Sequence, residues 1–242
     1  DMTKNMVIEF NSSNSLLSDH ISSIDIDQKN NLWIASNKGI HKVFGDKLIT
    51  VTTKEGLINN EVNSILVDSK NNIWCGTKGG VSKISGDEIS NSHKGKGLIS
   101  DEVTSLLEDS ESNVWVGTTN GLAMFSADGT LYNFDEAEGL IDKRITVIEK
   151  YNEKDILIGT AGGGIYVSSK DGGNYKFNYF EPSDMLVSKN ITFLESTTNN
   201  VLVGTDKGIC KLIFGNKQEI SVQHLDSRTG FEGNKCNLNA SV

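Results

Sequence analysis

A segment of about forty residues recurs along the chain, and this repeat constrains the fold more than any other feature of the sequence. Each clear copy contains a tryptophan that is followed, at fixed offsets, by a small residue and then by glycine and an aliphatic residue. The clear copies are residues 32–40, 73–81 and 114–122, and two copies with leucine in place of tryptophan are residues 156–165 and 201–209. The tryptophans are 41 residues apart. Self-similarity at a fixed period of this length is typical of repeat proteins.

A second motif, glycine-leucine-isoleucine followed by polar residues and an aliphatic one, keeps step with the first. Its copies are residues 56–62, 97–103 and 139–145, with weaker versions at residues 15–21 and 185–191. Between the two motifs the sequence alternates in short strand-like runs, and one unit divides into four of them. In the second unit these runs are residues 62–68, 73–77, 80–84 and 88–93.

A unit of four strands cannot bury both faces of its sheet by itself. Successive units must therefore pack face to face around an axis. Helical repeats of similar length would show an apolar stripe with a period of about 3.6 residues, and the sequence shows none. We therefore predict an all-β fold, a β-propeller fragment of four-stranded antiparallel blades with a period of about 41 residues.

Three sets of residues are expected to have structural roles in these blades. The tryptophans Trp33, Trp74 and Trp115 should lie between blades, where an aromatic side chain buries about 150–250 Å². A glycine opens each third strand, where it should relieve a backbone angle that a side chain would forbid; these are Gly39, Gly80, Gly121, Gly164 and Gly208. A small residue two places after the tryptophan or leucine should let neighbouring sheets approach closely; these are Ala35, Gly76, Gly117, Gly159 and Gly204.

All 242 residues are predicted to form one propeller domain that holds five complete blades and parts of two more. The predicted units are an outer strand of a preceding blade (1–14), blade 1 (15–55), blade 2 (56–96), blade 3 (97–138), blade 4 (139–184), blade 5 (185–229) and an inner strand of a following blade (230–242). Residues 6–11 and 236–242 would close a partial sixth blade, or the ring would stay open. We expect a ring that stays open or is completed by a partner, since two strands make a poor blade. Open edges would also favour a homodimer.

Composition excludes several classes of function. The net charge is −9 and no basic cluster occurs, so the electrostatic footprint of a nucleic-acid-binding protein is missing. No apolar stretch approaches the roughly 20 residues that span a bilayer, so direct membrane insertion by this fragment is not expected. Cysteines and histidines are scattered without ligand spacing, which predicts no metal, no cofactor and no catalytic triad. They are Cys75, Cys210, Cys236, His20, His41, His93 and His224.

Polar turns that begin with Asp27, Asp68 and Asp109 precede the three tryptophans. Their oxygen atoms are ligands that calcium accepts. Each turn supplies few carboxylates, however, and a hairpin connection explains the same residues. The hairpin interpretation is therefore preferred.

The block that runs from residue 56 to 81 and again from 97 to 122 resembles the repeat of the two-component regulator propeller family, and residues 230–240 resemble a late blade of that family. The resemblance is strong over residues 15–145 and looser beyond. It implies the periplasmic, extracytoplasmic sensor domain of a membrane-bound bacterial histidine kinase or hybrid two-component system, with the remainder of the parent receptor as partner. Many such receptors are thought to detect oligosaccharides, which implies an oligosaccharide ligand.

Ligands are expected on the face where each fourth strand leads into the next first strand and each second strand turns into the third. The loops of this face contain Asp19, His20, Asn60, Glu61, Lys78, Asp101, Glu102, Asn120, Lys143, Arg144, Lys189, Asn190, Asp206, Lys207 and Asn234. Amide, carboxylate and guanidinium groups hold sugars. From this set we select as ligand-binding residues Asn60, Asp101, Lys143, Arg144, Lys189, Asn190 and Asn234.

Within the selected set, the adjacent cations Lys143 and Arg144 are the preferred contacts for an acidic sugar. The alternative is that all of these are solvated loop residues. We predict a ligand-sensing module and not an enzyme. The rival functions are a propeller lyase or hydrolase acting on carbohydrate and a protein-interaction scaffold.

Overall fold

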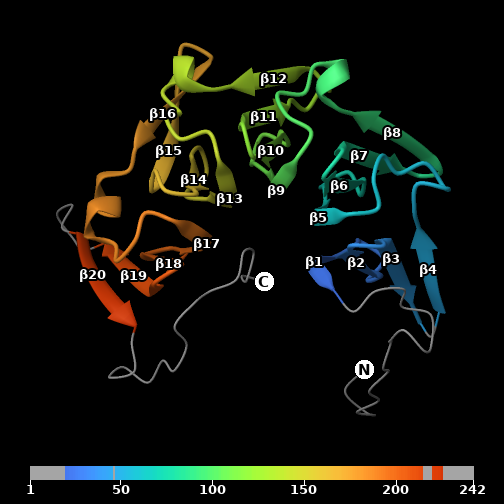
Figure 1. Ribbon diagram of the computed structural model, residues 1–242, viewed down its shortest axis with the longest axis horizontal. Helices are drawn as coiled ribbons and strands as arrows, with labels where there is room; N and C mark the ends of the chain where they lie inside the picture. Colours follow the sequence, from blue (N-terminus) through green and yellow to red (C-terminus); the bar gives the residue numbers. More distant parts are fainter. Residues whose placement is uncertain (1–19, 46, 215–219, 226–242) are drawn as a thin grey trace.

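The computed structural model of the chain describes residues 20–45, 47–214 and 220–225. They form five four-stranded antiparallel sheets, which stand side by side in an arc around a common centre (Figure 1). This confirms the prediction of an all-β propeller fragment. The expected outer strand at residues 1–14 and the expected inner strand at residues 230–242 lie outside the described residues.

The first sheet consists of β1 (Ile21–Ile26), β2 (Leu32–Ser36), β3 (Gly39–Phe44) and β4 (Lys47–Val51). The second consists of β5 (Val62–Val67), β6 (Ile73–Thr77), β7 (Gly80–Ser85) and β8 (Glu88–Ser92). The third consists of β9 (Val103–Glu108), β10 (Val114–Thr118), β11 (Gly121–Phe125) and β12 (Leu131–Phe134). The fourth consists of β13 (Ile145–Lys150), β14 (Ile156–Thr160), β15 (Ile165–Asp171) and β16 (Asn174–Tyr179). The fifth consists of β17 (Ile191–Thr197), β18 (Asn200–Thr205), β19 (Gly208–Phe214) and β20 (Ile220–Leu225).

Each sheet pairs its strands in chain order, so the first strand lies nearest the centre of the arc and the fourth lies outermost (Figure 1). The inner strands β1, β5, β9, β13 and β17 contact one another in that order. Short 3₁₀ helices lie in three of the connections from a fourth strand to the next inner strand. They are η1 (Lys94–Lys96), η2 (Glu136–Glu138) and η3 (Glu181–Met185).

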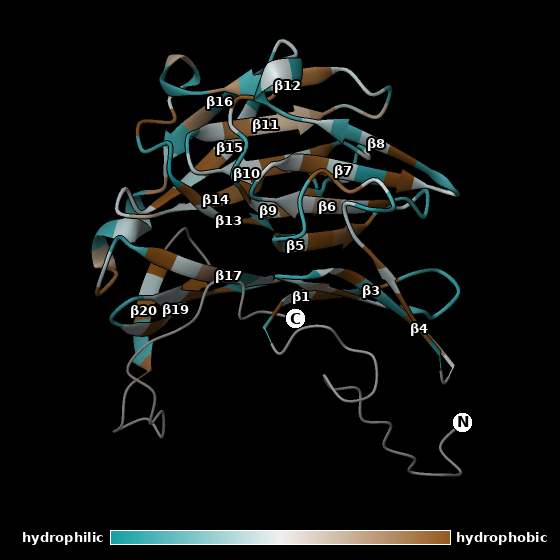
Figure 2. Cartoon of the chain, turned by 45° about the vertical axis from the view of Figure 1, so that its right-hand side comes forward, coloured by the Kyte–Doolittle hydropathy of each residue, from teal (hydrophilic) through white to brown (hydrophobic). Residues whose placement is uncertain are grey.

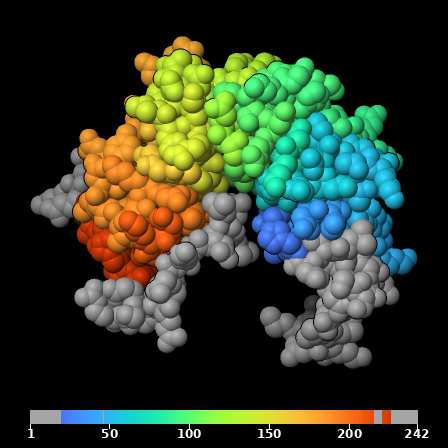
Figure 3. All heavy atoms as spheres, in the orientation of Figure 1, coloured from blue at the N-terminus to red at the C-terminus, as the bar shows by residue number. Residues whose placement is uncertain are grey.

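The hydrophobic core is divided among the four spaces between successive sheets. Side chains from both neighbouring sheets fill each space, while polar residues gather on the connecting loops (Figure 2). As spheres, the five sheets pack into a continuous arc whose first and last members are separated by the opening of the arc (Figure 3). Each interior sheet is therefore stabilised by two neighbours, and each end sheet by one described neighbour.

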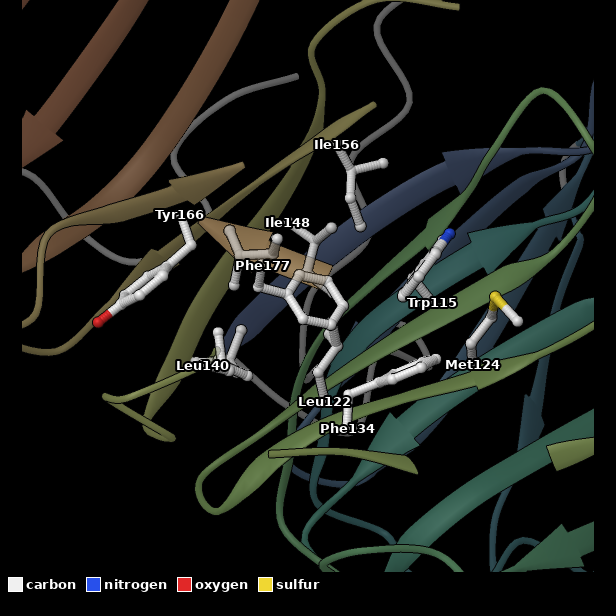
Figure 4. Close-up of a cluster of buried hydrophobic side chains, with 11 residues drawn as sticks. Trp115, Leu122, Met124, Phe134, Leu140, Ile148, Ile156, Tyr166 and Phe177 are labelled. Carbon is white, nitrogen blue, oxygen red and sulfur yellow. The ribbon is translucent and has the colours of Figure 1, made fainter. Parts of the chain in front are cut away.

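Every tryptophan packs against the sheet that follows its own. Trp33 joins a cluster with Val62 and Ile65 of the second sheet, and Trp74 joins one with residues of the third. Trp115 meets the ring of Phe177 edge-on at 6.2 Å between centroids, at the third interface (Figure 4). The tryptophans therefore lie between blades.

A single aspartate organises both the hairpin turn and the tryptophan in each of the first three sheets. Asp68 Oδ1 accepts the N–H groups of Lys70 (3.0 Å) and Asn72 (2.7 Å), and its Oδ2 accepts Nδ2 of Asn72 (2.7 Å) and Nε1 of Trp74 (2.8 Å). Asp27 and Asp109 bind their own turns and tryptophans in the same way. Nitrogen donors thus take up the oxygens that calcium would need, in agreement with the hairpin interpretation. We call this arrangement the Asp–Trp latch.

Ionisation of the carboxylate is part of the latch. Burial acts to raise the pKa of Asp27, but hydrogen bonds from Asn31, Trp33 and Lys29 outweigh it and lower this pKa to about 2. Because the folded pKa lies below the ordinary value of 3.8, the latch contributes stability above that pH. The contribution is lost as the pH falls through about 2.

The fourth and fifth sheets have lost both partners of the latch together. Leu157 and Leu202 stand at the tryptophan position, and the residues six places earlier are Tyr151 and Ser196. A leucine has no N–H group that requires an acceptor when buried, so the aspartate is no longer needed. At the interface of the fourth and fifth sheets, Leu157 packs within an apolar cluster instead.

Close approach of neighbouring sheets depends on the small residue of each second strand. A Cβ atom on Gly117 would lie 2.8 Å from Cγ2 of Ile145, the first residue of the next inner strand. On Gly159 it would lie 2.7 Å from Cγ2 of Ile191. Glycine at this position therefore makes room for the following blade. The glycines that open the third strands have a different reason, since their φ angles run from +82° to +131°.

Removing one latch carboxylate should destabilise the chain measurably. We expect Asp68→Ala to lower the free energy of unfolding by about 2 kcal/mol, because it leaves the buried Trp74 N–H and two turn amides without acceptors. The cost should shrink in a Trp74→Phe background. Asp87→Ala, which changes an exposed carboxylate in the β7–β8 turn of the same sheet, should cost less than about 0.5 kcal/mol. Urea unfolding of the four variants measures these differences, and equal losses at residues 68 and 87 would contradict the latch.

Candidate ligand-binding face and central cavity

Four of the residues selected from the sequence occupy one repeated position. Asn60, Asp101, Lys143 and Lys189 each lie two places before an inner strand, so the repeat brings them to the same face of the arc. Arg144 and Asn190 follow directly after two of them. The seventh selected residue, Asn234, lies outside the described residues.

The side chains at this position close their own connecting loops. Asn60 Oδ1 accepts the N–H of Thr53 at 2.8 Å, and Asp101 Oδ1 accepts the N–H of Lys94 at 2.6 Å. Lys143 pairs with Glu136 at 3.0 Å. In each case the partner lies seven residues earlier, where the connection begins. A structural role therefore accounts for these side chains.

The remaining selected cations are paired with acids of their own loops. Arg144 donates two N–H groups to Asp142, at 3.1 and 3.2 Å. Lys189 pairs with Asp184 at 2.7 Å and lies 5.1 Å from the ring centre of Tyr179. Hydrogen bonds with Asp184 and Tyr179 raise the pKa of Lys189. These cations have acidic partners before any ligand arrives.

Backbone atoms of the same residues join neighbouring sheets. The N–H of Gly39 donates to the carbonyl oxygen of Asn60 at 2.8 Å, and the N–H of Gly121 donates to that of Lys143 at 2.8 Å. Gly164 makes the equivalent bond to Lys189 at 3.0 Å. In each pair the glycine belongs to one sheet and the acceptor precedes the inner strand of the next. The selected positions thus lie where blades are linked.

A polar hollow of about 340 Å³ opens on this face between the first and second sheets. Its lining residues are His20, Ser22, Asn37, Lys38, Glu61, Val62, Asn63 and Lys78. His20, Glu61 and Lys78 belong to the loop residues expected on this face from the sequence, but they are not among the predicted ligand-binding residues, and Lys38 is in neither set. No pattern in one repeat marks these residues, because the hollow combines the β2–β3 loop of the first sheet and the β6–β7 loop of the second with residues at the starts of β1 and β5. We call it the first-interface hollow.

Charge in the first-interface hollow is only partly balanced. Lys78 and Glu61 form an ion pair at 2.5 Å, and this carboxylate raises the pKa of Lys78. Within the described ranges, the ammonium group of Lys38 has neither an ion pair nor a hydrogen bond. The hollow thus presents one uncommitted cation, together with amide and hydroxyl groups.

A larger cavity of about 560 Å³ lies at the centre of the arc. Its walls are β1 and parts of the inner strands β5, β9 and β13, and it shares Ser22 with the first-interface hollow. Both apolar and hydroxyl-bearing residues line it, among them Ile24 of β1, Ser64 of β5 and Ser105 of β9. The two spaces therefore adjoin, with the polar hollow nearer the loop face.

Two carboxylates in the central cavity bridge neighbouring inner strands. Asp25 Oδ2 accepts the N–H of Val67 at 2.7 Å, and Glu149 Oε1 accepts the N–H of Ser196 at 3.1 Å. Burial raises the pKa of Glu149 to about 7; the hydrogen bond from Ser196 and the charge of Lys150 oppose this rise. Glu195 adds to the rise because it carries the same charge. No sequence signal distinguishes Glu149 from the other glutamates of the strands.

The histidine that the structure buries does not serve the loop face. His41 lies between Ser36 and Thr50, with ring nitrogens 3.1 and 2.9 Å from their hydroxyl oxygens, and burial lowers its pKa. Across the described ranges, no group of three side chains is placed to hold a metal ion. Nor does any helix in them have the length and hydropathy to cross a bilayer. The groups that line the two spaces can donate and accept hydrogen bonds and can neutralise an anion.

Two segments, residues 56–79 and 97–120, match the family model described as "Two component regulator propeller". They are the first halves of the second and third units. The match therefore covers the repeats whose latches and glycines are best preserved. A search of curated protein sequences finds no match to this chain.

Solved structures share the architecture. The extracellular domain of a protein described as a hybrid two component system from B. thetaiotaomicron is 21% identical, with a TM-score of 0.74, over 92% of this chain and 31% of that one. One described as a one component system from the same organism is 15% identical, with a TM-score of 0.54, over 86% and 36%. Virginiamycin B lyase from Staphylococcus aureus is 10% identical, with a TM-score of 0.63, over 87% and 71%. The chain thus spans about a third of the two extracellular domains, and identities this low show the fold alone.

Replacing Glu149 by glutamine should remove a pH-dependent cost to folding. Because its pKa is higher in the folded chain than the ordinary 4.5, the contribution of Glu149 to stability should fall as the pH rises from about 4.5 to about 7. Glutamine can still accept the Ser196 N–H and carries no charge. We therefore expect Glu149→Gln to raise the free energy of unfolding at pH 8 by about 1 kcal/mol, reduced from the full shift because solvent reaches part of this side chain.

Urea unfolding of both proteins at pH 5 and pH 8 checks this expectation. The matched control is Glu153→Gln, at an exposed glutamate in the β13–β14 turn, which should leave the pH dependence unchanged. A Glu149→Gln variant whose stability follows that of the parent chain at both pH values would contradict the assignment.

Proposed function

We propose that this chain, which carries two-component regulator propeller repeats, is the ligand-sensing module of a bacterial two-component signalling receptor. The observation that carries the proposal is the first-interface hollow, a polar space of about 340 Å³ on the loop face beside a central cavity. The module would stand in the periplasm, outside the cytoplasmic membrane. It would pass ligand binding to the remainder of the parent receptor, a membrane-bound histidine kinase or hybrid regulator. The family match and the two extracellular domains of the same architecture support this role.

An oligosaccharide or another small extracellular ligand suits the chemistry of the hollow. Asn37 and Asn63 bring amide side chains, and Glu61 brings a carboxylate. Such groups donate to and accept from the hydroxyls of a sugar. The space is wide enough for one sugar unit, and its mouth at the loop face lets further units extend into solvent.

Lys38 favours a ligand that carries a negative charge. The preferred contacts from the sequence, Lys143 and Arg144, pair with Glu136 and Asp142 of their own loops. Lys38 has no such partner in the described part of the chain, so a carboxylate or sulfate on a sugar would complete its environment. We therefore propose Lys38 at the first interface, in place of Lys143 and Arg144, as the contact for an acidic sugar.

A carbohydrate lyase or hydrolase is the second candidate, since lyases share the architecture. His20 and Glu61 in the hollow are groups that can transfer protons. A protein-interaction scaffold is the third. We favour binding without turnover because the family match describes a regulator.

Calorimetric titration of the chain with oligosaccharides of uronic acid and of neutral glucose tests the proposal. We expect binding of the acidic series, and Lys38→Ala should weaken it about tenfold, the value of one charge-assisted hydrogen bond of about 1.4 kcal/mol. Lys207→Ala is the matched control, because Lys207 holds the same repeat position in the fifth sheet, outside the hollow. If no heat of binding is measured with either series, an oligosaccharide ligand is excluded. Appearance of cleaved or unsaturated products in the same mixtures would favour the enzyme.

A further inference from the structure

The fifth sheet has one covered face and one face without a described neighbour. Along β18 the buried residues Val201 and Val203 pack toward the fourth sheet, while Leu202 between them is only half-buried. The same alternation continues in β19, where Ile209 and Ile213 are half-buried. In the third sheet, β10 and β11 are buried at every position because neighbours lie on both sides. The outward face of the fifth sheet, marked by Leu202, Ile209 and Ile213, is therefore an unfinished interface.

The three interfaces between described sheets that have a glycine in the second strand, Gly76, Gly117 or Gly159, follow one packing rule. The glycine of a second strand receives the first residue of the next inner strand, as Gly117 receives Ile145 and Gly159 receives Ile191. The third residue of the inner strand in the same sheet also lies beside the glycine. It is Ser105 beside Gly117 and Val147 beside Gly159. At these two glycines, a serine or valine from the same sheet therefore packs beside an isoleucine from the next sheet.

Gly204, the equivalent glycine of the fifth sheet, has a different neighbour. The ring of Phe193, the third residue of β17, lies against it. Phe193 is the largest side chain at this position in the five inner strands, where the others are Ser23, Ser64, Ser105 and Val147. Because interfaces are packed to a similar density, the large ring of Phe193 leaves room only for a small residue at the first position of the next inner strand.

We propose that residues 230–242 dock on this outward face as the inner strand of a sixth blade, with Cys236 against Gly204 and beside Phe193. Gly230 and Cys236 have the spacing of Gly56 and Val62, which places Cys236 at the first position of an inner strand. Cysteine is smaller than the residues found there in the other strands, namely Ile21, Val62, Val103, Ile145 and Ile191. Cys236, the smallest residue at the first position of an inner strand, would thus pack beside Phe193, the largest residue at the third position.

A carboxylate of the fifth sheet, Glu195, is also placed to bind residues 230–242. Asp25 and Glu149, at the fifth position of their inner strands, each accept the N–H of the sixth residue of the next one. Glu195 holds this fifth position in β17, and its carboxylate has no hydrogen bond in the described ranges. The sixth residue counted from Cys236 is Ser241. Glu195 therefore supplies the acceptor for the N–H of Ser241.

Gly208 holds the position in the fifth sheet from which, in other sheets, a backbone N–H group links to the next sheet on the loop face. Gly39 and Gly121 donate their N–H groups to the carbonyls two places before the next inner strand. Two places before Cys236 lies Asn234. The backbone of Asn234 would then join the fifth sheet to the sixth, so its position serves assembly of the ring before it serves a ligand.

Thiol labelling of the whole chain tests whether Cys236 is covered. Cys75 and Cys210 are buried and give a protected background. We expect a maleimide to modify Cys236 at least tenfold more slowly in the native chain than in guanidinium, as followed by peptide mass spectrometry. Cys236→Ser/Asn234→Cys is the matched control, because a thiol on the loop face should react quickly. Equal rates for Cys236 in native and unfolded chain would overturn the proposal.

A volume exchange gives an independent readout. Phe193→Ser should lower the melting temperature by leaving a cavity, and Cys236→Ile should lower it by overfilling the interface. The double variant restores the serine and isoleucine pair of the third interface, so it should melt above both single variants. Effects that simply add would show that residues 193 and 236 do not touch, and would sink the proposed docking.

Discussion

A four-stranded sheet has two faces, and no side chain within the sheet can cover either of them. Stability therefore resides in the spaces between sheets, and every conspicuous residue of the repeat acts there. The tryptophan fills the space, as Trp115 does against Phe177, and the glycine of the second strand admits the next inner strand, as Gly117 admits Ile145. Each interface repeats these contacts with small changes in size. The protein is in this sense a chain of nearest-neighbour interactions and not a single core.

Much of this was predictable because the signals are local and recur. A carboxylate six residues before a tryptophan, with an asparagine or serine at positive φ in the turn between them, defines a hairpin whose geometry depends on local contacts. Asp68 and Trp74 illustrate this: the turn amides and the indole N–H converge on one side chain. The loss of aspartate and tryptophan together in the fourth and fifth sheets has the same origin. A buried indole without an acceptor would be costly, whereas Leu157 and Leu202 need none.

The candidate site could not be predicted to the same depth, because it depends on which loops meet across an interface. Residue type suggested Asn60 and Asp101, yet their side chains hold the amides of residues seven places earlier, a contact that sequence spacing alone did not reveal. No sequence signal marks Lys38, which is a lysine in a turn; its importance comes from lying beside the loop of the next blade. The same holds for Glu149, whose pKa of about 7 results from burial at the centre of the arc. Composition along one strand cannot report on burial created by another blade.

The position of the hollow has a consequence for signalling. At the first interface, Ser22 Oγ donates to the carbonyl of Val62, and at the second, Asn63 Nδ2 donates to that of Val103. Ser22 and Asn63 also line the hollow, so a ligand there would contact the side chains that hold successive inner strands together. A ligand shifts an equilibrium only by its difference in affinity for two states. Binding groups shared by two sheets provide such a difference whenever the angle between the sheets changes, whereas a site within one rigid blade would not. The interface between blades is thus both the source of stability and the place where binding can be converted into movement.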